Sequence, residues 1–513
     1  MKPYLGKKGY TILKKDLSSE QIKKIKTDLT IKPHVHGSPC QDTQNTYFVY
    51  RESNNKIYVP QHYGIKEFGL PTKVELSEGE NIDLEFNGQL RDYQIPVVEK
   101  YIHDVKSKHE TINGVSYGGG LLELPCAWGK TGSALNIITR LKKKTIVIVH
   151  KEFLMNQWIE RIQQFLPTAR IGKIQGQVID IENKDIVLCM LQSLAMKDYP
   201  ATMFVSFGFM IIDEVHHISS EVFSNSLFKI VTRYILGLSA TMNRKDGTSF
   251  VFKMFLGDVV FKGKREEKMS VEVRAIEYKA NDDDFNHVIT DFRGNTSYSS
   301  MITKLCEYNH RSEFILRVLI DLLRENENQQ IMILAHNKNL LKYLFDAIKH
   351  RNIADSSVGY YIGGMKESAL KETETKKVVI ATYAMASEGL DIKTLTTLIM
   401  ATPKTDIEQS VGRILREKNE NGPLVVDIID SHEPFKNQWK KRKAFYMKEK
   451  YKIIKTSNEV YMSVGNADSK WETVYDPSSK KDSSSKSKKQ TTICDSDGDP
   501  FLQGKCFITP FLN

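Results

Sequence analysis

The segment LLELPCAWGKTGSALNIITRL (121–141) joins an apolar run to a Gly-Lys-Thr triplet that opens a helical pattern. Backbone N–H groups in such a loop, together with the positive end of the following helix, bind phosphate. Lys130 would then reach the β- and γ-phosphates of ATP, and the Thr131 hydroxyl would ligate Mg²⁺. The alternative is a chance Gly-Lys-Thr at a helix start. The other loop residues expected to contact the nucleotide are Pro125, Cys126, Ala127, Trp128 and Gly129.

Two adjacent acids, Asp213 and Glu214, end a second apolar run, FMIIDE (209–214). Transfer of a phosphoryl group requires charge neutralisation and positioning more than covalent chemistry. We therefore expect Asp213 to hold Mg²⁺ through its water shell and Glu214 to polarise the attacking water. His216 and His217 suggest a metal site instead, but adjacent histidines point in different directions and no third ligand lies at a recognisable spacing.

Short β-rich runs, separated by helical or loop segments, must position these residues. Because parallel strands linked by helices are buried on both faces, such alternation predicts the α/β class with two doubly wound parallel sheets. A polar stretch (281–300) separates the two series. The predicted strands are 144–150, 185–191, 209–214 and 234–240 in the first series, and 331–337, 378–383, 397–402 and 423–430 in the second.

Changes in composition predict the domain boundaries. The basic run at 436–455 interleaves aromatic residues with lysines, so it would either stack on nucleic acid or pack its aromatics on the second domain; packing is the favoured interpretation. The predicted parts are an N-terminal α+β accessory domain (1–85), a nucleotide-binding domain (86–262), a connecting segment (263–300), a second α/β domain (301–435), a basic helix region (436–475) and a disordered Ser/Lys-rich tail (476–513).

The overall composition narrows the function classes. A chain of 513 residues predicts about three or four domains. No apolar run approaches the roughly 20 residues of a membrane span, and the start of the chain lacks a secretory signal, so we expect a cytoplasmic protein. The six cysteines form no CxxC pair, which argues against a zinc site or a disulfide framework. The net charge of +10 favours a polyanionic partner.

Taken in order, the segments from LRDYQ (90–94) to QSVGRILR (409–416) resemble the motifs of superfamily 2 helicases. The resemblance implies two RecA-like domains with ATP and Mg²⁺ between them. It also implies that Gln94 reads adenine, because an amide matches the paired donor and acceptor on that base. Segments 150–158 and 190–194 would contact the phosphates of a nucleic-acid strand. The residues that would couple hydrolysis to strand binding are Ser239, Ala240 and Thr241.

The resemblance extends through the second domain. In ATYAMASEGLDI (381–392) it places Gly389 and Asp391 against the nucleotide. Gln409, Arg413 and Arg416 lie about one helical turn apart, so all three can face one cleft. The two arginines would be arginine fingers, which stabilise the charge on the transferring phosphoryl group. The alternative without function is a simple loop for 381–392 and a solvated pair for Arg413 and Arg416.

The forms DEVHH and QSVGRILR favour a translocase over the local RNA-unwinding family. The segments LPCAWGKT and DEVHH resemble the XPB-like branch of the superfamily, which also includes poxvirus transcript-release helicases. Arg244, Lys245 and Asp246 follow the Ser-Ala-Thr segment where that branch carries an Arg-Glu-Asp element implicated in duplex opening, with the middle charge reversed. The stretch KIYVPQHYGIKEFGLP (56–71) resembles helicases of large cytoplasmic DNA viruses, and a viral chain would act in the viral factory or the virion.

The resemblance implies an ATP-dependent helicase or translocase, active as a monomer on DNA in transcription or in recombination and repair. RNA polymerase or other transcription machinery is an expected partner. An RNA helicase would share every ATPase residue and remains an alternative. A different class is also open: an ATP-gated nucleic-acid clamp, or a transcription-complex subunit with little turnover of its own.

Overall fold

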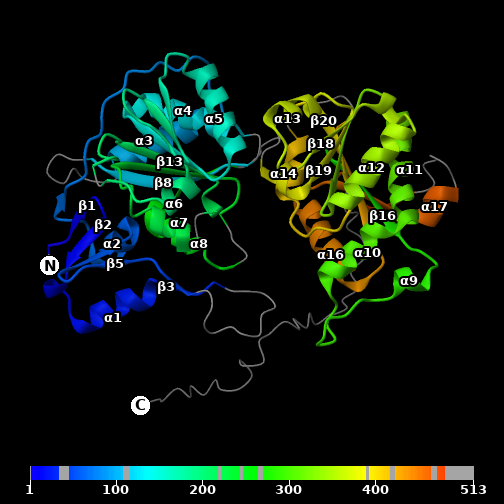
Figure 1. Cartoon of the computed structure of the whole chain (residues 1–513), viewed down its shortest axis with the longest axis horizontal. Coiled ribbons are helices and arrows are strands. Elements are labelled where there is room, and N and C mark those ends of the chain that lie inside the picture. Colours follow the sequence, from blue (N-terminus) through cyan, green and yellow to red (C-terminus); the bar gives the residue numbers. More distant parts are fainter. Residues whose placement is uncertain are drawn as a thin grey trace.

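The computed structural model describes residues 2–33, 46–107, 116–125, 128–200, 202–217, 221–242, 246–263, 270–388, 392–415, 422–463 and 471–479. These residues form two α/β domains side by side and a smaller N-terminal unit beneath the first of them (Figure 1). None of the helices in these ranges is long and apolar enough to cross a membrane.

The first α/β domain contains an eight-stranded sheet in the order β11-β10-β12-β9-β13-β14-β8-β15. Every neighbouring pair is parallel except the edge pair β10 and β11. The central strands carry nearly continuous apolar side chains because helices cover both faces of the sheet. The strands are β8 (Gly118–Glu123), β9 (Thr145–Val149), β10 (Ile171–Gln175), β11 (Val178–Asp180), β12 (Ile186–Met190), β13 (Phe209–Asp213), β14 (Tyr234–Ser239) and β15 (Val259–Lys262).

Helices connect these strands and pack on the two faces. Because the strands are parallel, the loops that follow β8, β9, β12, β13 and β14 all emerge at the same edge of the sheet. This edge therefore gathers the phosphate-loop and acidic residues. The helices of this domain are α3 (Ile95–Ser107), α4 (Lys130–Leu141), α5 (Glu152–Phe165), α6 (Leu191–Met196), α7 (Glu221–Ser226) and α8 (Ser249–Leu256).

The second α/β domain also contains an eight-stranded sheet, in the order β18-β19-β17-β20-β21-β16-β22-β23. Only the last pair, β22 and β23, is antiparallel. The strands are β16 (Glu272–Tyr278), β17 (Gln330–Ala335), β18 (Val358–Tyr361), β19 (Val378–Thr382), β20 (Leu395–Met400), β21 (Leu424–Asp430), β22 (Lys452–Ser457) and β23 (Glu472–Tyr475).

This second sheet includes strands from before and after the predicted range of the second domain, 301–435. β16 lies within 263–300, which was expected only to connect the domains, yet it pairs with β21 and β22 inside the sheet. β22 and β23 lie within 436–475, the expected helix region, and they extend the sheet beyond β16. The helices are α9 (Asp283–Asn286), α10 (Tyr298–Glu307), α11 (Asn309–Glu325), α12 (Lys338–His350), α13 (Glu367–Glu374), α14 (Tyr383–Glu388), α15 (Glu408–Val411), α16 (Glu433–Lys448) and α17 (Asn458–Ser463).

The basic helix α16 packs its aromatic side chains against the second domain. It ends at Lys448, short of the predicted 455, because the chain turns at Lys450 (φ 60°) into β22. Tyr446 and Tyr451 are buried in the core, and Trp439 and Phe445 pack partly against it. The favoured interpretation, an amphipathic helix packed on this domain, is confirmed by this burial.

The N-terminal unit is joined to the first domain by a shared apolar core. Tyr10 and Ile12 belong to the same buried cluster as Phe228 and Phe252. The guanidinium of Arg51 lies 5.4 Å from the ring centroid of Phe228. The unit has a five-stranded sheet, a two-stranded sheet and two helices: β1 (Tyr4–Gly6), β2 (Gly9–Leu13), α1 (Ser19–Asp28), β3 (Thr30–Ile31), β4 (Tyr47–Phe48), β5 (Arg51–Glu52), β6 (Lys56–Val59), α2 (Gln61–Phe68) and β7 (Lys73–Val74).

Candidate active site

The phosphate-loop residues lie between the end of β8 and the start of α4. Gly129 adopts a left-handed conformation (φ 80°) immediately before Lys130, the first residue of the helix. A Cβ atom at Gly129 would lie 2.3 Å from Nε2 of Gln94, so only glycine fits. Gly129 thus leads directly into the N-terminus of α4, and the free backbone N–H groups of a helix N-terminus are donors suited to an anion.

The bulky Trp128 within this loop is accommodated by burial. Its side chain is 7% exposed. The ring centroid lies 4.6 Å from that of Tyr93 and 6.2 Å from that of Phe261. Trp128 therefore packs between Tyr93 and Phe261, and it borders the cleft together with Gly129 and Lys130. The two neighbouring loop residues predicted to contact the nucleotide, Cys126 and Ala127, lie outside the described residues.

The two predicted acids lie next to Lys130. Nζ of Lys130 donates to Oε1 of Glu214 at 2.9 Å, and the two side chains are only 15% and 16% exposed. Glu214 has a positive φ of 51°, a conformation unusual for a residue with a side chain, and its N–H donates to Oδ1 of Asp213 at 3.0 Å. The chain turns sharply after β13, and this turn directs both carboxylates toward the loop.

Burial and neighbouring charges shift the pKa values of the two carboxyls in opposite directions. Burial raises the pKa of the Asp213 carboxyl, and the negative charge of Glu214 raises it further. Burial alone would also raise the pKa of Glu214, but the positive charge of Lys130, with smaller contributions from His216 and Arg413, lowers it below the usual range. Glu214 is therefore ionised at neutral pH, as a group that orients water must be.

The structure adds Trp158 to the site. Its indole N–H donates to Oδ2 of Asp213 at 2.9 Å, and its side chain is 2% exposed. The sequence placed Trp158 in a segment expected to contact a nucleic-acid strand, at 150–158. Its side chain is buried and its observed partner is the Asp213 carboxylate, while contact of segment 150–158 with a strand stays a prediction.

A cleft of about 570 Å³ extends from the phosphate loop to the second domain. Arg413 enters it from the second domain, and its Nε donates to the carbonyl of Ala386 at 2.9 Å. Gln409 lies in α15, which ends at Val411 and is followed by a 3-10 turn over Gly412–Ile414, and it is not among the residues that line the cleft. Gly389, Asp391 and Arg416 lie outside the described residues. The first-domain site residues along the cleft are Gln94, Trp128, Gly129, Lys130, Thr131, Asp213 and Glu214.

Side chains from the two domains meet along this cleft. Nδ2 of Asn156 donates to Oε2 of Glu367 at 2.6 Å, and Glu160 forms an ion pair with Lys371. Both contacts join α5 to α13, the two helices that face each other across the gap in Figure 1. The cleft walls are thus in contact through exposed polar groups, which can separate and re-form at little energetic cost.

The oxygen ligands at this edge fit Mg²⁺ bound together with ATP. Asp213 and Thr131 both line the cleft, and Oε2 of Glu214 is buried without a hydrogen-bond partner among the described residues. Within those residues no three His, Cys, Asp or Glu side chains gather into a metal-binding group. A carboxylate and a hydroxyl that leave the remaining positions to water and phosphate oxygens are the ligands that Mg²⁺ commonly has in nucleotide sites.

Gln94 supports the phosphate loop in this structure. Nε2 of Gln94 donates to the carbonyls of Trp128 (3.2 Å) and Gly129 (3.1 Å), and Oε1 accepts from the N–H of Arg91 at 2.9 Å. The side chain is 6% exposed. The role of Gln94 as the reader of adenine stays a prediction. Its contacts with the carbonyls of Trp128 and Gly129 would link a base bound at Gln94 to the phosphate loop.

The Ser-Ala-Thr segment is linked to the acids through His216. Nδ1 of His216 lies 3.0 Å from Oγ of Ser239 and 3.4 Å from Oε2 of Glu214. Ser239 in turn donates to the carbonyl of Thr241 at 2.6 Å. His216 therefore bridges the acid pair and the segment expected to couple hydrolysis to strand binding, with Ala240 between the two bonded residues.

The two segments expected to contact phosphates on the first domain lie at one edge and are joined to each other. Nε2 of Gln192 donates to the carbonyl of His150 at 2.7 Å. Oγ of Ser193 accepts from the N–H of Gly176 at 2.9 Å. Arg244 and Lys245 of the element after the Ser-Ala-Thr segment lie outside the described residues, and Asp246 accepts from Thr248 in a local turn.

Comparison with known proteins places these features in a family. Residues 87–244 match the family described as "Type III restriction enzyme, res subunit", and residues 315–418 match the "Helicase conserved C-terminal domain". A protein of Acanthamoeba polyphaga mimivirus, named as a candidate ATP-dependent RNA helicase, is 35% identical over 455 residues, which are 87% of this chain and 85% of the relative. The chain belongs to the superfamily 2 helicases. It is accordingly an ATP-hydrolysing helicase with two RecA-like domains.

Other relatives of this helicase also come from large DNA viruses. A candidate ATP-dependent RNA helicase of African swine fever virus is 29% identical over 364 residues, covering 66% of this chain and 71% of the relative. Among solved structures, yeast Dbp5 bound to RNA overlaps 73% of this chain and 91% of its own, at 12% identity and a TM-score of 0.49. Phage T4 UvsW overlaps 89% and 99%, at 17% identity and a TM-score of 0.33.

Proposed function

We propose that this helicase is an ATP-driven motor that moves along nucleic acid, with DNA as its track. The observation that supports this best is the division of the site between two domains. Lys130 and Glu214 stand on one wall of the cleft and Arg413 enters from the other. A site divided in this way converts nucleotide binding and hydrolysis into relative movement of the domains.

The residues divide the chemistry of hydrolysis as follows. Lys130 leaves its pairing with Glu214 to bind the phosphates, which frees Oε1 of Glu214. The ionised Glu214 then orients the attacking water. Thr131 and Asp213 would hold Mg²⁺, and the ion would supply charge neutralisation at the phosphates. Arg413 stabilises the charge that spreads over the transferring phosphoryl group, an effect worth roughly 10³ to 10⁵ in rate in related enzymes.

The end of the cleft beyond Lys130 suits a nucleobase. Phe86 and Phe165 stack there in parallel, with ring centroids 5.3 Å apart, and Leu90, Arg91 and Gln94 complete the lining. Apolar and aromatic walls with a few polar groups are typical of sites for flat ligands. We place adenine here, beside Gln94, because the base then lies one loop away from the phosphates.

DNA is the proposed track because the phosphate-loop and acid motifs resemble the XPB-like branch, and transcription or recombination and repair is the proposed setting. A net charge of +10 suits either polymer. RNA is the second candidate, and the specific observation in its favour is that relatives from two different viruses carry names of RNA helicases. RNA polymerase or other transcription machinery is the proposed partner in the cytoplasm, and the helicase is proposed to act as a monomer.

Steady-state ATP hydrolysis tests this proposal. Turnover is measured without nucleic acid and with single-stranded DNA, duplex DNA or RNA, at one fixed salt concentration because phosphate contacts are steeply salt-dependent. We expect DNA to stimulate turnover more than RNA. Stimulation by RNA alone would replace the DNA motor with an RNA helicase. Negligible turnover under all conditions would favour an ATP-gated clamp or a subunit that requires a partner.

Paired variants test the site separately from the track. Lys130→Ala and Glu214→Gln should abolish turnover and keep nucleic-acid binding. Lys142→Ala, at the exposed other end of α4, is the matched control and should retain turnover, because the ion pair of Lys142 among the described residues is with the exposed Asp83. Full turnover in Lys130→Ala or Glu214→Gln would refute the site assignment.

A further inference from the structure

A short arm, defined as residues 288–297, projects from the second domain between α9 and α10. Its two sides meet at an antiparallel bridge between Thr290 and Thr296. The N–H of Asp291 donates to the carbonyl of Asn295 at 2.7 Å, and the N–H of Ser297 donates to the carbonyl of Ile289 at 2.8 Å. The arm is thus a small hydrogen-bonded hairpin.

The tip of the arm presents a phenylalanine to solvent. Phe292 is 91% exposed, more than any other large apolar residue in the described part of the chain. The carboxylate of Asp291 accepts from the N–H groups of Arg293 and Asn295, both at 2.9 Å, so the arm's own acid is used within the turn. Gly294 supplies the positive φ (79°) that closes the turn. The conformation of the tip is therefore set by hydrogen bonds within the turn and not by packing of the Phe292 ring.

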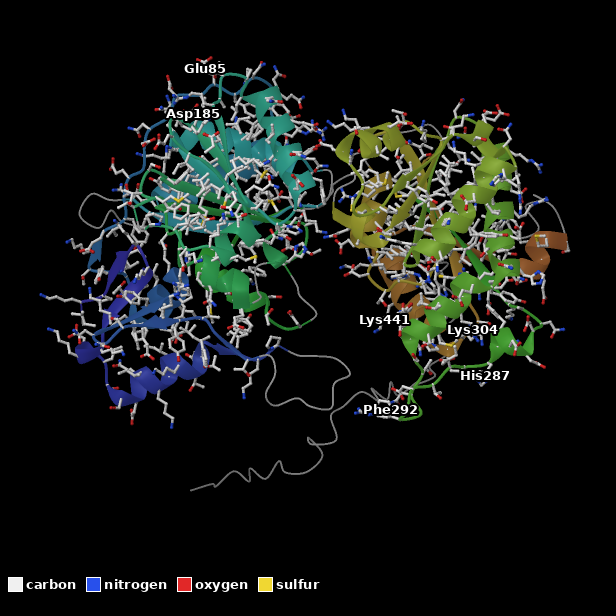
Figure 2. The ribbon with its side chains drawn as sticks, in the orientation of Figure 1. Glu85, Asp185, His287, Phe292, Lys304 and Lys441 are labelled. Atoms are coloured by element: carbon white, nitrogen blue, oxygen red, sulfur yellow. The ribbon has the colours of Figure 1, made fainter. Side chains whose placement is uncertain are left out.

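A cation accompanies this ring. The guanidinium of Arg293 lies 4.9 Å from the ring centroid of Phe292. With the ring this exposed, its remaining surface is open to a flat partner, and the guanidinium can reach a phosphate beside that partner. Figure 2 places Lys304 and Lys441 at the same end of the second domain as Phe292. Lys304 also secures the base of the arm, because its Nζ donates to the carbonyl of His287 at 2.7 Å.

The arm is tied to the edge of the second sheet at which its parallel strands end. It follows β16, and the phenolic O–H of Tyr298 donates to the carbonyl of Pro403, just beyond β20, at 3.3 Å. The loop after β19, where the resemblance expects contact with a nucleic-acid strand, leaves this same edge because β17, β19, β20, β21 and β16 are parallel. The arm lies at the opposite end of this domain from α13 (Figure 1). Residues of α13, among them Glu367 and Lys371, line the ATP cleft.

We propose that Phe292, supported by Arg293, is a stacking site for an unpaired base of the nucleic acid that this helicase moves along. An exposed aromatic ring offers an open face on which a flat partner can stack, and every base presents a matching face. The neighbouring Arg293, Lys304 and Lys441 complement a polyanionic strand. The site favours a single strand over a duplex, since a base paired inside a duplex has no free face. This inference rests on the proposed nucleic-acid motor.

The test compares Phe292→Ala, Phe292→Trp and the matched control Phe48→Ala, whose ring is 53% exposed on the N-terminal unit. Binding to a fluorescent single-stranded oligonucleotide is measured at fixed salt, with DNA and RNA in parallel, beside basal ATP hydrolysis. Base stacking of this kind predicts that Phe292→Ala weakens binding about 5- to 150-fold. Phe292→Trp and Phe48→Ala should bind as the parent does, and basal hydrolysis should be unchanged in all three.

A second comparison separates bases from backbone. The parent protein should bind an oligonucleotide with abasic spacers more weakly than the normal oligonucleotide. Phe292→Ala should bind the two oligonucleotides equally well, because it has already lost the ring on which a base would stack. The slope of log affinity against log salt should stay unchanged in Phe292→Ala, because no phosphate contact is removed.

Three results would overturn the stacking site. If the parent binds and Phe292→Ala binds equally well, the stacking site fails while the motor stands. If Phe292→Ala changes only self-association in light scattering, the arm is a protein contact. If the parent neither binds nucleic acid nor is stimulated by it, the proposed function itself fails, which the parent's own data distinguish from failure of the arm.

Discussion

The hydrogen bond from Trp158 to Asp213 leads to a prediction about magnesium dependence. Trp158→Phe removes the indole N–H, which lies 2.9 Å from Oδ2 of Asp213, and keeps most of the buried ring. Because Asp213 is proposed to hold Mg²⁺, loss of this donor should leave its carboxylate less well oriented and weaken the binding of the ion. The substitution therefore tests the orientation of the Asp213 carboxylate while leaving the carboxylate itself in place.

The expected magnitude follows from the type of bond. A hydrogen bond to a charged group contributes about 1.5–3 kcal/mol, and each 1.4 kcal/mol corresponds to about a tenfold change. We expect the Mg²⁺ concentration for half-maximal ATP hydrolysis to rise about tenfold or more in Trp158→Phe. The smaller ring also leaves a cavity, so global stability should fall by about 1–3 kcal/mol, and the assay must be run well below the unfolding temperature.

The assay is a Mg²⁺ titration of ATP hydrolysis at saturating nucleotide. Trp439→Phe is the matched control, because Trp439 is a partly buried tryptophan that packs on the second domain, remote from Asp213. It should keep the parent's Mg²⁺ dependence even if its stability falls. A Trp158→Phe protein that is folded, less stable and unchanged in Mg²⁺ dependence would refute the positioning role and leave Trp158 as a core residue.

Two further predictions concern the second domain. Asp427→Asn should lower its free energy of unfolding by about 3–5 kcal/mol, because Arg442 is fully buried and bonds both oxygens of Asp427 at 2.7 and 2.8 Å. Denaturant titration checks this, and replacing both partners with apolar residues should restore most of the loss. Glu313→Gln should lower stability by about 1 kcal/mol at pH 7, because the exposed Arg351 and the hydroxyl of Tyr343 lower the pKa of Glu313 from 4.5 to about 2. That contribution is present above pH 4.5 and is lost as pH falls toward 2, so melting curves of the two proteins should converge in acid; a constant gap would contradict the assignment.

The parts of the fold that could be predicted from sequence were those encoded by local pattern. Strands β9, β12, β13 and β14 coincide closely with predicted runs because strands covered on both faces must be apolar throughout. The segment around Pro60 shows a strand end that the local sequence pattern did not predict. The run KIYVPQHYGI (56–65) has the composition of a single strand, but β6 ends at Val59 and Pro60 caps helix α2, since proline lacks the N–H needed to continue a ladder.

Long-range pairing explains what the sequence missed in the second domain. β16 belongs to the second sheet only because β21 and β22 pair with it, and both follow it by well over a hundred residues. Its alternating polar and apolar residues and the polar stretch that follows gave no sign of those partners. The same reasoning applies to Trp158, because its partner Asp213 is brought near by sheet order and not by any motif.

The contacts around His216 suggest how hydrolysis is communicated to the strand-binding edge. Lys130 bonds Glu214, His216 lies within 3.4 Å of Glu214 and 3.0 Å of Ser239, and Ser239 bonds the backbone of Thr241. When phosphates draw Lys130 away, Glu214 loses its principal cation, and His216 becomes the nearest positive or donor group. Movement of His216 toward Glu214 would break its bond to Ser239, and the Ser239 hydroxyl, which also bonds the backbone of Thr241, would lose one of its partners in the predicted coupling segment. Coupling of this kind requires only one discrete rearrangement of a buried hydrogen bond, because a donor shared between two acceptors cannot satisfy both at short distance.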